Sequence, residues 1–256
     1  MDNGGDSFTL NSLGLVESAR REIVETVVIS SAVLDAAIHA DGANINFNHS
    51  TGTINGNVSS HSNVQHYDDM TITGTVTSGV DKVNPSLDFD YYKSLAQSQG
   101  QYYTNNRTLN NTTVNGVYYT TKRVDIGSNV IINGAIFAEG NIRFSNNGSN
   151  VSINSTSNYP VLASQSSITT QGSGNHLSNS TINGLIYADS GVNLDYLNGT
   201  VITGIILADQ GVDMTDSNNI SVTYDSGVLS PMPAGFTYTA GGQTTALPQG
   251  DWDELY

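Results

Sequence analysis

The sequence contains no cysteine and no long apolar run, and it has very few positively charged residues. Of its 256 residues, 8 are lysine or arginine and 23 are aspartate or glutamate, a formal net charge of -15. So few cations argue against binding to a nucleic-acid backbone or to anionic lipid headgroups, which need clustered lysine and arginine. No stretch is long and apolar enough to span a bilayer. Residues 1–7 lack the basic-then-apolar pattern of a signal peptide, so any targeting segment is expected outside this sequence.

The absence of cysteine means that no disulfide holds the fold, and it leaves the cellular compartment open. Only 12% of the residues are charged, so asparagine, serine, threonine and glycine carry the polarity. That composition suits stacked strands with tight turns, because asparagine and glycine tolerate positive φ and threonine favours strands. The alternative, a disordered low-complexity chain, conflicts with the regular spacing of isoleucine and valine.

A short motif recurs along the chain. Residues 182–189 read INGLIYAD, and the motif returns at 202–209 as ITGIILAD and occurs earlier at 132–139 as INGAIFAE. Partial copies stand at Ile38, Ile54, Ile72, Val114 and Val222. Steps of 18–25 residues predict stacked structural units.

One copy is degenerate. The gap between the copies at residues 133 and 183 is 50 residues, and its midpoint is Asn158. Setting Asn158 on Asn133 places Val161 on Ile136, which predicts a copy in register at this point.

Each step suits one turn of a β-solenoid made of two or three short strands. Alternate residues of a strand share a face, so the isoleucine and alanine of the motif are expected to point into the coil. We therefore predict an all-β fold, a single-stranded parallel β-helix that is right-handed as parallel crossovers generally are. The expected parts are N-terminal strands or a cap at residues 1–30, a solenoid at 31–230 and a C-terminal tail or cap at 231–256.

Two segments depart from the repeat. Residues 8–30 predict two strands with a turn near residues 14–19, with a capping helix as the alternative. An insertion is predicted at 80–113. Within it, Ser86 is a candidate N-cap, and Leu87, Tyr91 and Leu95 recur every four residues, which predicts a helix over 86–98. The helix is expected to cover the coil, although insertions on solenoids also form binding faces.

Asparagine or threonine precedes glycine in most copies. A corner asparagine in the left-handed conformation, followed by glycine, lets the chain turn, and stacked amides can hydrogen-bond from coil to coil. The predicted corner ladder, structural in role, consists of Asn55, Asn115, Asn133, Asn158, Asn183 and Thr203.

Several segments together resemble a known group: residues 8–28, the repeats at 132–144 and 182–194, the copy at 158–163 and the helical segment from Pro85. On these residues most of the chain resembles the extracellular part of PilX-like type IV pilus assembly or pilus-associated proteins. The resemblance implies a parallel β-helix, pilin-like or filament subunits as partners, and an extracellular or bacterial cell-surface location. The pilin-like apolar helix of that group does not occur in this sequence.

Two carboxylates, Asp189 and Asp209, occupy the same motif position one turn apart. At a strand spacing of about 4.8 Å they repel by about 1 kcal/mol if fully solvated, and a calcium ion would relieve this repulsion. Glu139 and Asp41 share the position, whereas Ser164 interrupts the row. Calcium at Asp189 and Asp209 is a candidate beside the simpler interpretation, a solvated acidic face, and no other cofactor is expected.

No catalytic constellation is recognised, and the protein is predicted not to be an enzyme. The carboxylate pairs at 68–69 and 88/90 would suit a polysaccharide-cleaving β-helix but have no recurring basic or histidine partner. The strand at 71–77, TITGTVT, suggests an ice-binding threonine array, but the copies at 132, 182 and 202 do not keep its threonines. Six tyrosines near the insertion form either an aromatic platform for carbohydrate or a packing surface: Tyr91, Tyr92, Tyr102, Tyr103, Tyr118 and Tyr119.

The leading hypothesis is a non-catalytic structural or interaction protein, an exported β-solenoid of a type IV pilus-like filament or a cell-surface adhesin. Its expected partners are filament subunits or surface glycans, with no nucleic acid and no membrane contact. The alternative is a secreted β-helix that binds or cleaves polysaccharide, and a third hypothesis is a cation-stabilised surface adhesin.

Overall fold

The computed structural model describes residues 6–16, 19–29, 35–66, 69–80, 84–145, 148–156, 159–170, 177–229 and 233–237. These residues divide into two compact units, one within residues 1–32 and the other within 33–237. The first is an antiparallel hairpin of β1 (Asp6–Val16) and β2 (Ala19–Ile29), which confirms the predicted strand pair and excludes the capping helix. Within the described residues no helix is long and apolar enough to cross a membrane.

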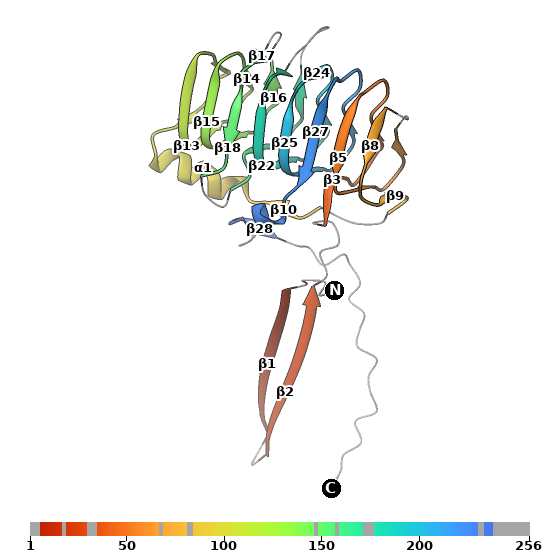
Figure 1. The fold of residues 1–256 in the computed structure, drawn as a ribbon. Coiled ribbons are helices and arrows are strands. Elements are labelled where there is room, and N and C mark those ends of the chain that lie inside the picture. Colours follow the sequence, from red (N-terminus) through yellow and green to blue (C-terminus); the bar gives the residue numbers. More distant parts are fainter. Residues whose placement is uncertain are drawn as a thin grey trace. The chain divides into compact units, whose positions relative to one another are not determined.

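The second unit is a parallel β-solenoid, as predicted (Figure 1). Its thirteen-stranded sheet contains β3 (Ala36–Ala40), β5 (Gly52–Asn55), β6 (Asn57–Ser60), β8 (Met70–Ile72), β9 (Val76–Ser78), β11 (Tyr102–Tyr103), β13 (Thr112–Thr120), β15 (Val130–Ala138), β18 (Ser152–Asn154), β19 (Leu162–Ser164), β22 (Thr181–Ala188), β25 (Val201–Ala208) and β27 (Ile220–Tyr224). Its eight-stranded sheet contains β4 (Ile45–Asn46), β7 (Val64–Gln65), β12 (Arg107–Leu109), β14 (Val124–Ile126), β16 (Ile142–Phe144), β20 (Ile168–Thr170), β23 (Val192–Asn193) and β26 (Val212–Asp213). A three-stranded sheet contains β17 (Gly148–Ser149), β21 (Leu177–Ser178) and β24 (Leu197–Asn198). The remaining elements are β10 (Ser86–Leu87), which pairs antiparallel with β28 (Phe236–Thr237), the helix α1 (Phe89–Ser98) and a 3-10 helix (Ser226–Leu229).

The coils do not stack in the order of the sequence. β25 pairs with both β27 and β3, so the coils of residues 35–80 follow those of residues 101–224 along the solenoid. Ile206 pairs with Ile38 and Ala208 with Ala40, although these partners are 168 residues apart (206 minus 38). In Figure 1 the orange strand β5 accordingly lies beside the blue strand β27.

The motif alternates as predicted. Ile186 and Ala188 are fully buried members of the core inside the coil. Tyr187, between them, is buried outside the core cluster, where its ring lies 6.4 Å from that of Phe89 on α1. The same strands therefore bury one face inside the coil and the other beneath the helix.

Helix α1 covers this second surface. Its residue range is close to the predicted one, but the helix packs through a different side from the predicted stripe. It begins after the N-cap Asp88, whose side chain accepts a hydrogen bond from the backbone N–H of Tyr91, and it buries Phe89, Tyr92 and Ala96. The predicted N-cap Ser86 and the predicted stripe through Leu87, Tyr91 and Leu95 are therefore wrong. The helix starts at residue 89 and packs through positions i, i+3 and i+7, which leaves Tyr91 42% exposed.

Two further sequence predictions need correction. Part of the insertion at 80–113 is itself a coil, because β11 pairs with β13 and β12 pairs with β14. The degenerate copy is shifted by one residue, since Leu162 rather than Val161 pairs with Ile136. The segment between β18 and β19 is longer than in the other copies, and this extra length displaces the register.

Candidate functional site

One surface of the solenoid, which we call the open face, is formed by β18, β27, β5, β8 and the first halves of β13, β15, β22 and β25. These strands run side by side in Figure 1, from β13 at one end to β8 at the other. Each contributes one residue that points into the core and two flanking residues that point outward. The outward residues are exposed or half-exposed along the whole face.

The outward residues form two rows in strict register across eight strands. From β13 to β8 the first row is Thr113, Ile131, Ser152, Thr181, Val201, Ser221, Thr53 and Thr71. The second row is Asn115, Asn133, Asn154, Asn183, Thr203, Thr223, Asn55 and Thr73. Two rows of eight give sixteen positions, which hold seven threonines, five asparagines, two serines, one isoleucine and one valine. None is charged, in a chain with 31 charged residues (8 basic and 23 acidic).

Hydrogen bonds along the second row hold its side chains in place. The Asn133 amide donates to Oδ1 of Asn115 over 3.0 Å, and the Asn183 amide donates to Oδ1 of Asn154 over 2.7 Å. The Asn154 amide also donates to the hydroxyl of Ser152 in the first row, over 3.0 Å. Such ladders stabilise a sheet with little twist.

Five of the six residues of the predicted corner ladder lie in this second row: Asn55, Asn115, Asn133, Asn183 and Thr203. The sixth, Asn158, lies outside the described residues, and the row is completed by Asn154.

The asparagines of the second row are not the left-handed residues of the corner. The glycines that follow them take the positive φ, for example 144° at Gly134 and Gly184. A separate set of asparagines, just before the open face, is left-handed: Asn111, Asn129, Asn150, Asn179 and Asn219. Asn129 and Asn150 donate amide hydrogen bonds to Asn111 and Asn129 respectively, so this set also forms a ladder at its start. The predicted corner ladder therefore merged two separate ladders, one on the open face and one of left-handed asparagines just before it.

The six tyrosines do not form one binding surface. Tyr92 is buried between α1 and the sheet, where its ring stacks on Phe137 at 3.9 Å and its hydroxyl donates to the carbonyl of Ala234. Tyr119 is 1% exposed, and its hydroxyl hydrogen-bonds Glu139 over 3.2 Å. Tyr91, the other tyrosine of α1, is 42% exposed.

The remaining three tyrosines lie in the first coils. Tyr118 is 3% exposed inside the coil, its ring is 4.7 Å from that of Tyr103, and its hydroxyl accepts from Nε of Arg107. The ring of Tyr102 lies 6.0 Å from that of Tyr119. Packing between elements accounts for these positions.

The motif carboxylates form a longer row than the sequence indicated. Because β3 follows β25, Asp41 stands next to Asp209, which stands next to Asp189 on consecutive coils. Burial raises the pKa of Asp209, a hydrogen bond from the amide of Asn84 over 3.0 Å opposes this, and the charges of Asp189 and Asp41 add to the rise. Burial also raises the pKa of Asp189, opposed by a hydrogen bond from the hydroxyl of Tyr187.

Calcium at Asp189 and Asp209 stays a prediction. Among the residues that the structure describes, no group of three or more histidine or acidic side chains could hold a metal ion.

Replacing Asp189 with asparagine is expected to stabilise the fold near neutral pH. A carboxyl whose pKa is raised on folding binds more protons when folded, so its contribution to stability falls as pH rises through the folded pKa. The amide can still accept from Tyr187 but carries no charge, so the gain at pH 7 should be about 0.5 kcal/mol for this half-buried, water-screened group. The gain should decrease as the pH falls and disappear well below the unfolded pKa of about 3.9, where the parent carboxyl is neutral in both states. Urea unfolding of both proteins from about pH 3 to 7.5 measures this, with the same change at an exposed site, Asp69→Asn, as the matched control. A loss of stability at pH 7 would contradict the expectation.

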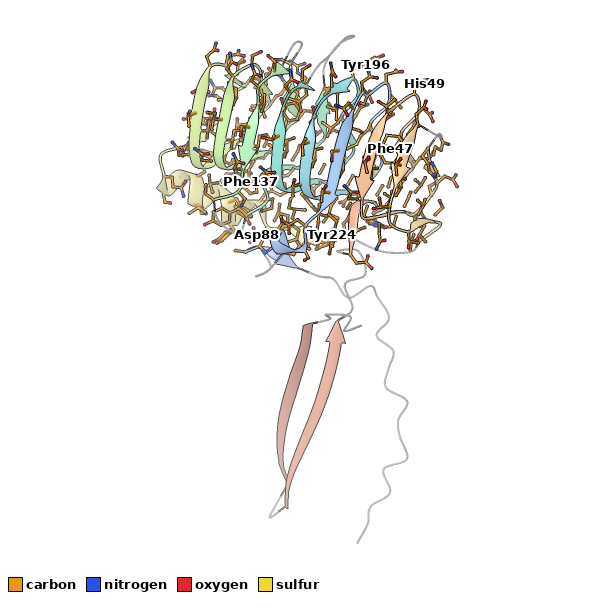
Figure 2. The ribbon with its side chains drawn as sticks, in the orientation of Figure 1. Phe47, His49, Asp88, Phe137, Tyr196 and Tyr224 are labelled. Carbon is orange, nitrogen blue, oxygen red and sulfur yellow. The ribbon has the colours of Figure 1, made fainter. Side chains whose placement is uncertain are left out.

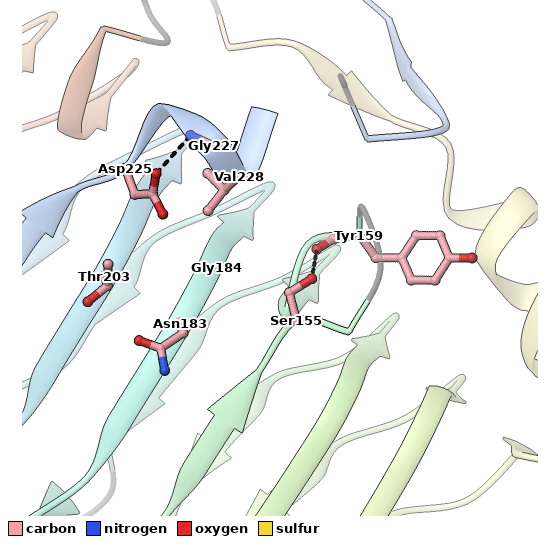
Figure 3. A pocket seen from close by; sticks show the side chains of 8 residues that line it. All are labelled: Ser155, Tyr159, Asn183, Gly184, Thr203, Asp225, Gly227 and Val228. Atoms are coloured by element: carbon pink, nitrogen blue, oxygen red, sulfur yellow. Dashed lines mark hydrogen bonds between the residues drawn. The ribbon is translucent and has the colours of Figure 1, made fainter. Parts of the chain in front are cut away.

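A groove of about 380 Å³ borders the open face (Figure 3). Asn183 and Thr203 of the second row line one side of it. The other lining residues are Ser155, Tyr159, Gly184, Asp225, Gly227 and Val228. The N–H of Gly227 donates to Oδ1 of Asp225, which fixes the loop after β27 at this rim. The groove marks one margin of the open face at β22 and β25.

The other acidic and histidine candidates have structural surroundings. Asp88 is the N-cap of α1 and Asp90 lies in its first turn, while Asp68 lies outside the described residues. His39 is fully buried, and its Nδ1 lies 2.7 Å from the hydroxyl of Ser59. His49 and Tyr196 lie at the upper corner of the solenoid in Figure 2, where Nδ1 of His49 is 3.5 Å from Asp216.

No family model matches the chain, and no curated protein is similar to it. Several solved structures of similar fold are ice-binding proteins. One is from the Antarctic ascomycete Antarctomyces psychrotrophicus, with 16% identity over 75% of this chain and 96% of that chain, at a TM-score of 0.46. Another is from Shewanella frigidimarina, with 14% identity over 75% of this chain and 95% of that chain, at a TM-score of 0.48. A third is LeIBP from an Arctic yeast, with 14% identity over 73% of this chain and 90% of that chain, at a TM-score of 0.41.

These comparisons overturn the predicted relationship to PilX-like pilus proteins. No model of that group matches, and the structural neighbours are ice-binding proteins instead. The predicted role in a pilus filament or as an adhesin, with pilin subunits or surface glycans as partners, is therefore wrong. The polysaccharide-binding or polysaccharide-cleaving alternative is not better supported by the same comparisons. The predicted repeats were real, but they are general to stacked strands and do not identify a pilus protein.

Proposed function

We propose that this protein binds ice through the open face. The observation that supports this most is the register of two uncharged outward rows across eight consecutive strands. The similar solved structures are too distant to assign their function to this chain, so the proposal rests on the face itself. It is a non-enzymatic function, and it places the protein outside the cell, where it meets ice.

The side chains of the open face suit a crystalline water surface. Threonine, valine and isoleucine are stiff at χ1, so holding them in one arrangement costs little conformational entropy. Their methyl groups favour release from bulk water, while hydroxyl and amide groups offer donors and acceptors at regular positions. Charged groups, which hold strongly bound and differently oriented water, are missing from both rows.

The spacing is regular in two directions. Successive strands lie about 4.8 Å apart, and outward residues of one strand lie about 6.6 Å apart. These repeats are comparable with those between oxygen atoms on the surfaces of hexagonal ice. A flat array can therefore match the lattice over many positions at once, so that weak contacts add up.

The first part of the threonine array at residues 71–77 belongs to this face, whereas Thr77 lies on β9 and pairs with Ser59 of β6. Thr71 and Thr73 end the two rows at β8. The sequence did not predict the array because the copies at 132, 182 and 202 do not keep threonine at both positions. The residues of the two rows share small size, β-branching or a side-chain amide. This similarity can be recognised only when it is known which strands pair with each other.

Thr181→Tyr should remove most ice-binding activity from the folded protein. Thr181 lies near the middle of the first row, and a bulky ring there would hold the neighbouring positions away from the ice surface. We expect thermal hysteresis and inhibition of ice recrystallisation to fall about tenfold in effective concentration, the equivalent of roughly 1.4 kcal/mol.

The matched control is Thr108→Tyr, the same change at an exposed threonine on β12, outside the open face. It should leave ice activity unchanged, and both variants should keep the parental unfolding midpoint. Equal activity in the Thr181 variant, or no activity in the parent protein, would contradict the proposal.

A further inference from the structure

A second surface of the solenoid, which we call the third face, is strongly divided in charge. It is formed by the eight-stranded sheet, in the order β12, β14, β16, β20, β23, β26, β4 and β7. Its central outward row is Thr108, Asp125, Arg143, Thr169, Asn193, Asp213, Asn46 and Gln65. This row holds a cation on the third strand, Arg143, and anions on the second and sixth, Asp125 and Asp213.

The end near β12 to β16 is basic. Three of the chain's eight lysines and arginines lie there: Lys122, Arg123 and Arg143. Nε of Arg143 and Nε of Arg123 both pair with Asp125, at 2.6 Å and 3.1 Å. One carboxylate therefore serves two guanidinium groups, each of which has further N–H donors. With one anion against three cations, this end carries a net positive charge.

The end from β23 to β4 is acidic. Asp195, Asp213 and Asp216 lie on or beside its strands, and His49 is beside Asp216. Asp195 and Asp213 share one donor, since the N–H of Thr215 lies 3.2 Å from the first and 3.1 Å from the second. Burial and the charge of Asp213 raise the pKa of Asp195, which is the response of a carboxylate that lacks a neighbouring cation. The half-buried row of Asp41, Asp189 and Asp209 borders the same end.

We propose that the third face is the interface of a two-fold homodimer, in which the basic end of each copy pairs with the acidic end of the other. A two-fold axis along the strand direction, between β20 and β23, places the third strand of one copy opposite the sixth strand of the other. Arg143 then faces Asp213 of the second copy, twice in the dimer, because a two-fold interface is self-complementary. The same operation places Thr169 opposite Asn193 of the second copy, so that no like charges meet at the centre of the row.

The acidic end also has room for the incoming side chain. A shallow groove of about 500 Å³ lies beside Asp213, over Gly191 and Gly211, which have no side chains. Asn44, Asn46 and Asn193 also line it. Arginine recognises such carboxylate and carbonyl groups with its planar set of donors.

The interface is expected to be weak and dependent on salt. Seven strand spacings of about 4.8 Å and a width of about 15 Å give on the order of 500 Å² per copy, below the roughly 800 Å² per partner of a standard stable interface. Exposed charges attract through water that salt screens within about 10 Å at 0.1 M. The open face takes no part, so this inference stands independently of ice binding.

Sedimentation velocity of the whole chain between about 10 and 200 µM tests the interface. In 20 mM salt we expect a concentration-dependent dimer, and in 500 mM salt a monomer. A monomer at every concentration in low salt would overturn the proposal. A dimer of unchanged strength in 500 mM salt would also overturn it, because the proposed attraction is electrostatic.

Charge-reversed variants identify the surface. Asp213→Arg and Arg143→Glu should each be monomeric in low salt, whereas an equimolar mixture of the two should form a heterodimer, since every reversed charge then meets its opposite. Asp69→Arg, the same charge change at an exposed site outside the third face, should still dimerise. Because the mixture regains association without refolding, misfolding cannot imitate the result. Single variants that still dimerise like the parent, or a mixture that stays monomeric, would refute the interface.

Discussion

Gly204→Ala should destabilise the solenoid by more than about 3 kcal/mol, combining backbone strain with overpacking in a fold where most substitutions cost far less. Gly204 lies where β25 bends from the open face to the surface beneath α1, and its φ is 145°, a region that residues with a Cβ rarely adopt. A Cβ here would overlap the carbonyl oxygen of Gly184 in the neighbouring coil. The neighbour cannot move away, because Gly184 has the same constraint against the segment before β19.

The control for this effect is Gly191→Ala. Gly191 has no positive φ, and its new Cβ would meet only the carbonyl oxygen of Gly211, at 3.3 Å. We expect a change within about 0.5 kcal/mol, as for an ordinary surface substitution. Guanidinium unfolding followed by circular dichroism measures both variants. Equal stabilities for the two would show that the bend accommodates a side chain, contrary to the stacking described here.

Phe137→Ala should cost about 3–5 kcal/mol, the range for removing a buried phenylalanine. Phe137 is fully buried under α1, with its ring stacked on Tyr92 at 3.9 Å and edge-on to Phe89 at 6.1 Å (Figure 2). Removing the ring leaves a cavity in the surface that joins the helix to the sheet. The conservative Phe137→Leu keeps most of the volume and should cost less than about 1.5 kcal/mol.

Phe137→Ala also tests whether the surface beneath α1 contributes to ice activity. At 0 °C, where the folded state of Phe137→Ala still predominates, its ice activity should equal that of the parent, because residue 137 faces α1 and the outward rows are on another surface. Chemical unfolding gives the stability and thermal hysteresis gives the activity. A variant that unfolds like the parent would mean that α1 does not depend on this ring. A variant that is fully folded but inactive would connect the helix to ice binding.

The motif residues by themselves determined the architecture of one coil. Isoleucine and alanine two residues apart fill the interior, as Ile186 and Ala188 do, because alternate residues of a strand share a face. The recurring glycine marks a bend that only glycine permits, at Gly134, Gly184 and Gly204. These are local constraints, so they can be read from the sequence without knowing which strand lies next to which.

The candidate site was only partly readable. The second row could be predicted as a ladder because the same residue, asparagine, recurs before glycine. The first row could not be predicted, because its residues are similar in size and differ in identity, as do Thr113, Ile131 and Val201. The helix was found, but its buried face was not, since the spacing of Leu87, Tyr91 and Leu95 is as regular as that of the residues that pack.

Only the tertiary structure decided the order of the coils. Ile38 pairs with Ile206, and Asp41 joins Asp209, although nothing near residue 38 distinguishes this arrangement from stacking in sequence order. Every coil presents similar edges, so local pattern permits many orders. The segment around α1 determines the order, because it connects one end of the solenoid to the other. It is held in this position by the burial of Phe89 and Tyr92 against Phe137. That long-range burial makes one continuous eight-strand open face out of two distant parts of the sequence.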